Sequence, residues 1–155
     1  MANTMEARDA VSGSLAEFYV TIMGRRYNLM QATEFESKWG INLADVPILG
    51  RVTKGKKPTG ASGTWTAKVH YNQSAVRKWL LHYKKTGIIE PMEIQCANED
   101  PSSRAGRQTI THTGCYVDNS TLAKFMTGDE ILTEDISGTF DDWDMPEMFD
   151  ELEGM

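Results

Sequence analysis

The stretch that decides the fold is Thr64-Trp65-Thr66-Ala67-Lys68-Val69-His70-Tyr71, in a sequence of 155 residues. Its apolar and aromatic side chains occupy every second position, which is the period of a β-strand with one buried face. Patterns typical of strands recur in six further segments: residues 15–23, 27–38, 92–96, 108–117, 121–126 and 131–140. The first two are separated by a short glycine turn, so they are predicted to form a hairpin. The sequence therefore predicts a mainly β protein with seven or eight strands.

One helix is predicted directly after the first-named strand, over residues 75–85. Val76, Trp79, Leu80 and Tyr83 recur at intervals of three and four residues, so they share the face that packs against the sheet. A glycine two residues after this segment can end the helix. Because strands and helices do not alternate along the chain, we expect an antiparallel β-barrel or two-layer sandwich with one flanking α-helix.

Length and composition leave room for a single ordinary domain, since 40% of the residues are hydrophobic and 25% are charged. We expect an N-terminal arm over residues 1–14, a β-barrel domain over residues 15–145 and an acidic C-terminal tail over residues 146–155. No apolar run approaches the roughly 20 residues that a membrane helix needs. The N-terminus also lacks the apolar segment of a signal peptide.

Charge is distributed unevenly along the chain. Residues 51–85 contain nine basic and no acidic residues, residues 129–155 contain eleven acidic and no basic residues, and the net charge is −6. Such a chain can attract copies of itself, basic segment to acidic segment. It can equally fold its two charged segments against each other, and charge alone does not decide between these arrangements.

Residues 50–63 hold four glycines and a proline, and they predict a long basic loop or the tip of an extended hairpin. The residues before it are expected to form a loop (39–45) and a short extended piece (46–49). The start of the basic segment nearly matches a phosphate-binding loop. However, Lys57 stands where that motif needs a hydroxyl group for magnesium, and a strand follows instead of a helix. Nucleotide binding is therefore disfavoured.

No other residues form a convincing catalytic or metal-binding set. His70, His82 and His112 are scattered, and Cys96 and Cys115 lack companions at the spacing of metal ligands. The basic segment carries no aromatic side chain for stacking on bases, and the chain as a whole is acidic, which argues against direct nucleic-acid recognition. We expect a protein without cofactor or metal that is not an enzyme.

Several stretches resemble the PBSX-like prophage tail tube family in order and spacing, over roughly residues 10–149. They are Leu49-Gly50-Arg51, Lys54-Gly55-Lys56-Lys57-Pro58-Thr59-Gly60, Gly63-Thr64-Trp65-Thr66, Tyr83-Lys84-Lys85-Thr86-Gly87, Gln95-Cys96-Ala97-Asn98-Glu99-Asp100-Pro101-Ser102-Ser103 and Glu134-Asp135-Ile136-Ser137-Gly138-Thr139-Phe140-Asp141-Asp142-Trp143-Asp144-Met145-Pro146. The sequence departs from the family in a longer N-terminal arm and in residues 39–47.

This resemblance implies the inner tube subunit of a contractile tail, with a fold shared with the tubes of type VI secretion. Six copies would form a ring, rings would stack head to tail, and sheath contraction would drive the tube through the target envelope. In a phage the lumen would conduct DNA. In a headless R-type bacteriocin, a tailocin of the diffocin kind, the tube would depolarise the target membrane.

The same resemblance implies the partners. They are further copies of the chain, the tail sheath protein, baseplate and hub proteins and the tape measure protein, with DNA only in transit and the target membrane on penetration. The particle would be assembled in the bacterial cytoplasm and released by lysis.

From the residues themselves we hypothesise that Arg51, Lys54, Lys56 and Lys57 contact the adjacent ring, because a mobile basic loop occurs in an acid-rich chain. A solvated loop tip is the simpler alternative. Each exposed ion pair contributes only about 0–1 kcal/mol, so the strength of assembly must come from repetition. A different class of function is a β-barrel adaptor at a tail terminus, which binds its neighbours without polymerising.

Overall fold

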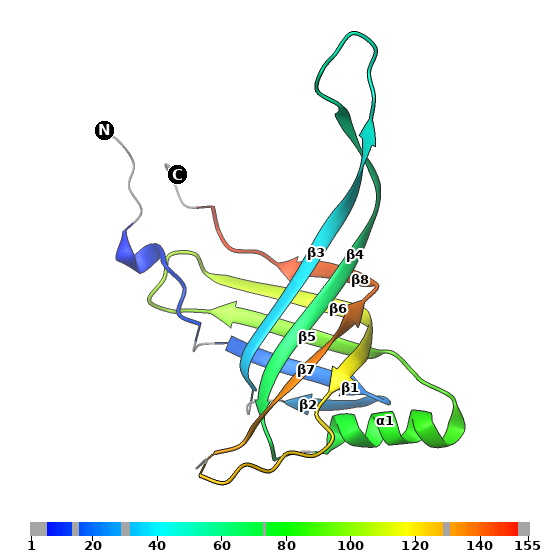
Figure 1. Ribbon diagram of the computed structural model, residues 1–155. Helices are drawn as coiled ribbons and strands as arrows, with labels where there is room; N and C mark the ends of the chain where they lie inside the picture. Colours follow the sequence, from blue (N-terminus) through cyan, green and yellow to red (C-terminus); the bar gives the residue numbers. More distant parts are fainter. Residues whose placement is uncertain (1–5, 14–15, 29–31, 73, 129–130, 152–155) are drawn as a thin grey trace.

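The computed structural model describes residues 6–13, 16–28, 32–72, 74–128 and 131–151 (Figure 1). Its elements in chain order are η1 (Ala7–Asp9), β1 (Ala16–Ile22), β2 (Arg25–Asn28), β3 (Ala32–Val46), β4 (Gly55–His70), α1 (Ala75–Thr86), β5 (Met92–Glu99), β6 (Arg107–Ser120), β7 (Thr133–Phe140) and β8 (Asp142–Glu147). The prediction of a mainly β protein with one α-helix is confirmed for the described residues.

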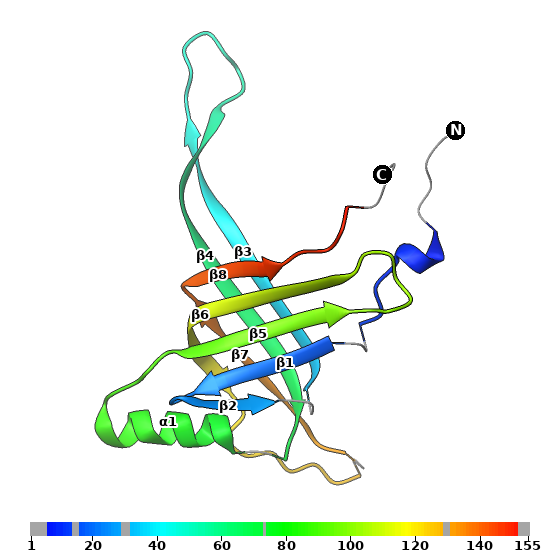
Figure 2. The same ribbon diagram turned by 180° about the vertical axis from the view of Figure 1, so that it is seen from behind.

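All strand pairs are antiparallel, and they form one sheet in the order β2-β1-β5-β6-β7-β4-β3, with β8 also paired to β6. Strand β6 takes part in two layers. Its first part pairs with β5 and β8, and its last part, from Tyr116 to Ser120, pairs with β7. We call β2, β1, β5, β8 and the first part of β6 layer A, and β3, β4, β7 and the last part of β6 layer B. The strands of the two layers cross, as seen from both sides (Figures 1 and 2).

The hydrophobic core lies between these layers. Strand β4 supplies Trp65, Ala67 and Val69 from its inward face, while the residues between them are exposed, as the alternation predicts. The indole N–H of Trp65 donates a hydrogen bond to the carbonyl oxygen of Thr139 at 3.2 Å. The other buried apolar side chains of the core are Phe18, Val20, Ile22, Trp79, Met92, Ile94, Cys115, Ile136 and Phe140.

Helix α1 lies at one end of the barrel and packs through Trp79, which is 2% exposed and donates from its indole nitrogen to the carbonyl oxygen of Glu90 at 2.9 Å. Val76 and Leu80 are partly buried against the core. Tyr83 was expected on this face, but it is 48% exposed. The reason is visible in Figure 1, where the last turns of α1 extend beyond the sheet. Gly87 ends the helix in the left-handed conformation, as predicted.

Two predictions before β4 are wrong. Residues 27–38 do not form one strand but contribute to β2 and β3, which lie in different layers because they pair with β1 and β4 respectively. Residues 39–45 are not a loop but continue β3. Within residues 50–63, only residues 50–54 lie outside strands. Of the two alternatives, a long loop or the tip of an extended hairpin, the hairpin tip is therefore correct.

One later prediction also needs correction. Residues 121–126 lack strand structure, because none of the described strands pairs with them, although their composition favours a strand. Strand β8 extends to Glu147, so the first part of the acidic segment 146–155 belongs to layer A. The limits drawn for an arm, a domain and a tail stay a prediction.

The described ends of the chain both attach to the loop between β5 and β6. Asp9 forms an ion pair with Arg104, and the backbone N–H of Ser12 donates to the carboxylate of Asp100 at 2.9 Å. On the other side, the N–H of Asp150 donates to the carbonyl oxygen of Ala105 at 2.7 Å. Within the described residues, no helix is long and apolar enough to cross a membrane.

Candidate assembly surfaces

The most prominent feature of the surface is a two-stranded arm, which we define as residues 39–63. The last residue pair that ties β4 to β7 is Gly63 with Phe140, and beyond it β3 and β4 pair only with each other. The arm therefore leaves the barrel as an isolated ribbon (Figure 1). A two-stranded ribbon without a packed face is only marginally stable in water. We therefore expect the arm to pack against a surface outside its own subunit.

One face of the arm carries an apolar stripe. Trp39, Ile41 and Leu43 follow each other at alternate positions of β3, and they are 47%, 54% and 56% exposed. Only the base of this stripe is covered, where the rings of Trp39 and Trp143 meet edge to face at a centroid distance of 5.7 Å. Exposed apolar surface of this kind marks a contact with another molecule.

The tip of the arm gathers the four cations that the sequence analysis singled out. Arg51, Lys54, Lys56 and Lys57 are all exposed. Lys56 forms an ion pair with Asp45 on the facing strand, while the other three cations make no ion pair among the described residues. The tip also exposes apolar side chains, since those of Leu49 and Val52 are fully accessible and those of Val46 and Ile48 are more than a third exposed.

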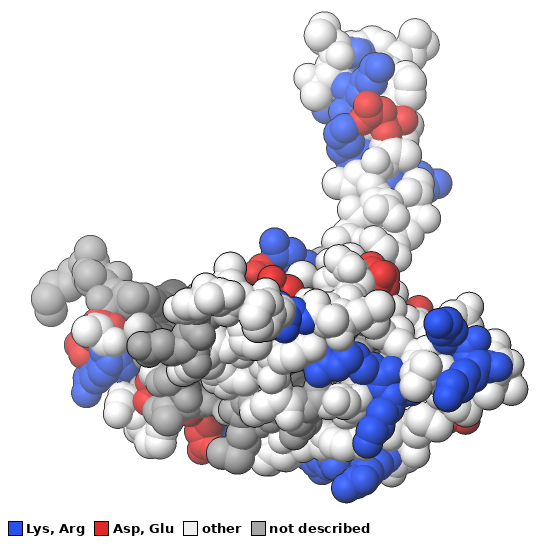
Figure 3. All heavy atoms as spheres, turned by 60° about the horizontal axis from the view of Figure 1, so that its bottom comes forward, with Lys and Arg blue, Asp and Glu red and all other residues white. Residues whose placement is uncertain are grey.

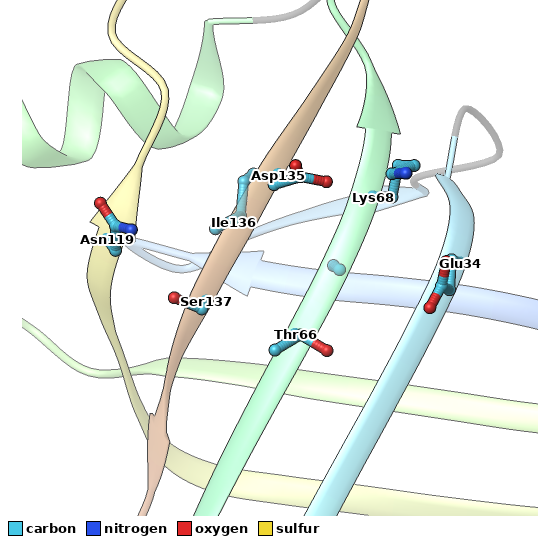
Figure 4. Close-up of a pocket in the computed structure, with 8 residues that line it drawn as sticks. Glu34, Thr66, Lys68, Asn119, Asp135, Ile136 and Ser137 are labelled. Carbon is cyan, nitrogen blue, oxygen red and sulfur yellow. The ribbon is translucent and has the colours of Figure 1, made fainter.

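A second surface is the outer face of layer B, which is polar (Figure 4). Neighbouring strands place their side chains in rows, and one row runs from Glu34 through Lys68 to Asp135. A second row joins Thr66 to Ser137. A shallow hollow of about 270 Å³ lies on this face, lined by Glu34, Thr66, Ala67, Lys68, Asn119, Asp135, Ile136 and Ser137.

The sheet also leaves edges open. Strand β3 and the last part of β6 form the edges of layer B, and β2 and β8 form those of layer A. An edge strand presents unpaired N–H and C=O groups that can pair with another chain. Among the described residues the subunit therefore offers strand edges in two crossing directions.

A basic surface lies at the end of the molecule that carries α1. Figure 3 shows Lys and Arg side chains gathered over this end. Its exposed cations are Lys78, Lys84 and Lys85 of α1 and Arg25 and Arg26 of β2. The guanidinium group of Arg26 lies 4.0 Å from the ring centroid of Tyr19, and that of Arg25 lies 5.2 Å from the ring of Tyr27. Both distances lie within the range of a cation–π interaction.

The two oppositely charged segments of the sequence do not fold against each other as a whole. Among the described residues, one ion pair joins residues 51–85 to residues 129–155, between Arg77 of α1 and Glu134 of β7. Both side chains are largely buried, with 20% and 4% of their surfaces exposed. Most of the basic segment is therefore left for contacts outside the subunit.

The titratable groups of the interior have structural positions. His112 is buried, donates from Nδ1 to the carbonyl oxygen of Ile94 at 3.1 Å and accepts at Nε2 from the hydroxyl of Ser37 at 2.9 Å. Burial raises the pKa of the Cys115 thiol to about 12, and it also raises the pKa of Cys96. Both cysteines are free. In the part of the chain that the structure describes, no three His, Cys, Asp or Glu side chains are grouped so that they can hold a metal ion.

The sequence analysis missed the apolar stripe of the arm. Its signal was present in Trp39-Gly40-Ile41-Asn42-Leu43, where apolar residues alternate with polar or small ones. It also missed β8 and the exposed apolar side chains in residues 121–131. The functional surfaces are therefore contact surfaces, spread over the arm, the outer face of layer B and the two ends of the subunit.

The described subunit is a small β-barrel with crossed layers, one flanking helix and a long projecting hairpin. The sequence profile of the family described as "Phage tail tube protein" matches residues 3–147. The chain belongs to this family, and it is a structural component of a phage tail or tail-like particle.

Individual proteins agree with this assignment. The chain is 28% identical over 143 residues to "Phage-like element PBSX protein XkdM" of Bacillus subtilis (strain 168), covering 92% of this chain and 95% of that relative. Its fold is similar to a chain in the sheath–tube complex of the extracellular contractile injection system PVC in the extended state. That match has a TM-score of 0.65 and 12% identity, covering 90% and 93% of the two chains. It is also similar to Hcp1 from Flavobacterium johnsoniae, with a TM-score of 0.51 and 14% identity over 88% and 99% of the chains.

Proposed function

We propose that this chain is the inner tube subunit of a contractile tail. Six copies close into a ring, rings stack head to tail, and the hollow tube is driven through a target envelope when a surrounding sheath contracts. The role is structural and not catalytic. The likeness to a chain of a sheath–tube complex supports the contractile setting.

The observation that carries this proposal is the arm. Residues 39–63 leave the barrel with an apolar stripe on one face and three unpaired cations at the tip, and within the described subunit only the base of the stripe is covered, by Trp143. A long projection that is stable only when covered fits a subunit whose neighbours are always present. If the arm binds a different surface of the next copy, that contact is heterologous, and heterologous contacts propagate into rings or filaments.

The two layers suggest how the ring and the lumen are made. The open edges of layer B, β3 and the last part of β6, are suited to pairing between neighbours in one ring. The outer face of layer B then lines the lumen. This face mixes Glu34 and Asp135 with Lys68 and hydroxyl groups, so it offers no continuous basic surface on which a DNA polyanion would be retained.

The remaining partners follow from the same assignment. A sheath protein surrounds the tube, baseplate, hub and tape measure proteins set its start and length, and the target membrane is met on penetration. In a phage the tube carries DNA, and in a headless R-type bacteriocin it depolarises the target cell. The particle is assembled in the bacterial cytoplasm and released by lysis.

Electron microscopy of the purified protein at rising concentration tests this function. We expect rings and hollow filaments of constant diameter. A protein that stays monomeric at all concentrations, or that forms only a small closed oligomer, would favour the adaptor at a tail terminus instead.

The inter-ring role of Arg51, Lys54, Lys56 and Lys57 has its own test. Replacing all four by glutamate should leave single rings but few stacked ones, because the tip then repels the acidic subunit. A matched control reverses the same number of charges at the other end of the molecule, at Arg25, Arg26, Lys84 and Lys85. Full-length tubes from the arm variant would refute this role, and an equal loss in the control would show that the effect is not specific to the arm tip.

A further inference from the structure

A second group of exposed apolar side chains lies far from the arm, in the segment that joins β6 to β7. Leu122, Phe125, Met126 and Ile131 are 72%, 90%, 53% and 68% exposed. We call these four side chains the loop surface. Single exposed apolar residues are common, but a phenylalanine exposed to this degree among three other apolar side chains of one loop is characteristic of a binding surface.

The backbone of this segment is held in place by hydrogen bonds. The hydroxyl of Tyr71 donates to the carbonyl oxygen of Leu122 at 3.5 Å, and a guanidinium nitrogen of Arg77 donates to that of Thr121 at 3.3 Å. The ammonium group of Lys124 donates to the carbonyl oxygen of Thr133 at 2.8 Å. The polar groups of the loop therefore point to the body of the subunit, and its apolar side chains are presented outwards.

The loop surface and the arm lie at opposite ends of the molecule. Strand β4 begins at Gly55, next to the arm tip, and ends at His70, next to the residue that holds the loop. Sixteen strand residues span about 50 Å. Figures 1 and 2 show the arm at one end and the segment between β6 and β7 at the other.

We propose that the loop surface is the receptor for the apolar stripe of the arm of a second copy in the adjacent ring. This inference rests on the proposed stacking and adds where the arm binds. Two different apolar surfaces at opposite ends of one subunit cannot satisfy each other within that subunit. Joined between copies, they form a head-to-tail contact that repeats without closing, which is what a stack of rings requires.

The size of the two surfaces agrees with such a contact. With the exposed fractions given above, the four loop side chains together with the stripe and tip of the arm can bury about 1,000 Å² in total. This is near the lower limit for a specific interface, so one contact is weak and six in a ring are strong.

Charge also agrees with this occupant. Asp118 of β6 is an exposed carboxylate near the start of the loop, and it makes no ion pair among the described residues. The arm tip brings Arg51, Lys54 and Lys57, which are likewise unpaired within the described subunit.

Disulfide cross-linking tests the contact directly. A chain carrying both Leu43→Cys and Phe125→Cys should link copy to copy under mild oxidation and give a ladder of covalent multimers on a non-reducing gel. Leu43 lies opposite Pro58, and the roughly 40 Å of β4 between Pro58 and His70 excludes a link within one subunit. Each single variant should stay monomeric on the gel. The arm of one copy contacts the loop surface of another copy and not its arm, so a single introduced cysteine has no partner. The native Cys115 is buried, and the partly exposed Cys96 is replaced by alanine in every variant, so neither native thiol takes part in the reaction.

Intact tubes of the double variant that give no ladder would overturn the proposed receptor while leaving the proposed function standing. Dimers from Leu43→Cys alone would also overturn it, because they would show an arm-to-arm contact. If the wild-type chain forms no tube at all, the proposed function fails and this inference fails with it.

A second variant separates binding from folding. Phe125→Asp should keep the wild-type melting temperature and ring formation but reduce tube length at least tenfold. Ile88→Asp is the matched control, because Ile88 is 63% exposed and lies outside both the arm and the loop. Wild-type tube lengths from Phe125→Asp, or an equal loss from Ile88→Asp, would contradict the assignment.

Discussion

At the scale of single residues, Gly138 shows how closely the strands of layer B approach. A Cβ atom at this position would collide with the backbone carbonyl oxygen of Tyr116 and lie 2.9 Å from the indole of Trp65. We therefore expect Gly138→Ala to reduce the free energy of unfolding by about 1–3 kcal/mol. Urea denaturation of the monomer measures this. Gly40→Ala is the control, since a Cβ there meets no atom within 4 Å, and equal losses in both variants would contradict the prediction.

Because His112 is buried, we expect the stability of the protein to depend on pH. Burial lowers its pKa below the ordinary value of 6.5, although the hydrogen bond to Ile94 partly opposes this. Between the lowered pKa and 6.5 the unfolded chain binds a proton that the folded chain does not, so stability is complete above pH 6.5 and decreases as the pH falls. The urea midpoint should decrease from pH 7 to pH 5, and His112→Leu should flatten that decrease. An unchanged slope in the variant would exclude His112 as the cause.

The Arg77–Glu134 ion pair fastens α1 to β7. Removing Arg77 would leave the carboxylate of Glu134, whose side chain is 4% exposed, without its cation. Arg77→Met should therefore cost about 3–5 kcal/mol of unfolding free energy, and adding Glu134→Gln should recover part of it. Lys38→Met, which breaks the exposed pair with Glu36, should cost less than about 1 kcal/mol. Equal costs for the two ion pairs would show that burial does not decide their contribution.

At the scale of elements, strand β4 and helix α1 could be predicted because each has one buried face that repeats with its own period. Trp65, Ala67 and Val69 mark the strand, and Trp79 with its neighbours marks the helix. The arm carries only the short alternation of Trp39, Ile41 and Leu43, and neither of its faces is buried in the subunit, so this pattern did not lead to the prediction of a strand. The prediction for residues 121–126 was wrong for the opposite reason. Their composition favours a strand, but no described strand pairs with them.

The candidate surfaces show the same limit. The four cations of the tip are close in sequence, so their grouping could be predicted from spacing alone. The loop surface joins Leu122, Phe125, Met126 and Ile131 to an anchor at Tyr71, and these residues come together only after β4 and β7 have paired. Surfaces assembled from distant segments need the register of the sheet, which a single sequence does not supply.

Truncating the arm tests whether it serves assembly and not folding. Replacing residues 41–61 by a two-residue Asn-Gly turn should leave the barrel folded, because the arm contributes none of the buried core residues between these positions. We expect a melting temperature within about 3 °C of wild type and no tubes in the microscope. An unfolded product would show that the arm belongs to the folding unit, and normal tubes would show that stacking does not need it.

At the scale of the whole molecule, the subunit has two unlike ends. One end carries the arm with its exposed apolar stripe, and the other carries the loop surface beside the basic face of α1. The two crossed layers leave edges in two directions. Identical copies can therefore associate side by side and end to end through different contacts. Each contact is weak, and the assembly is stable because many copies repeat the contact.

The most direct measurement is a cryo-electron microscopy reconstruction of the assembled protein without imposed symmetry. It should show a hollow cylinder with sixfold rings, the polar face of layer B towards the lumen, and one arm from each subunit resting on the loop surface of a subunit in the next ring. A compact particle, or a filament without a lumen, would contradict the account.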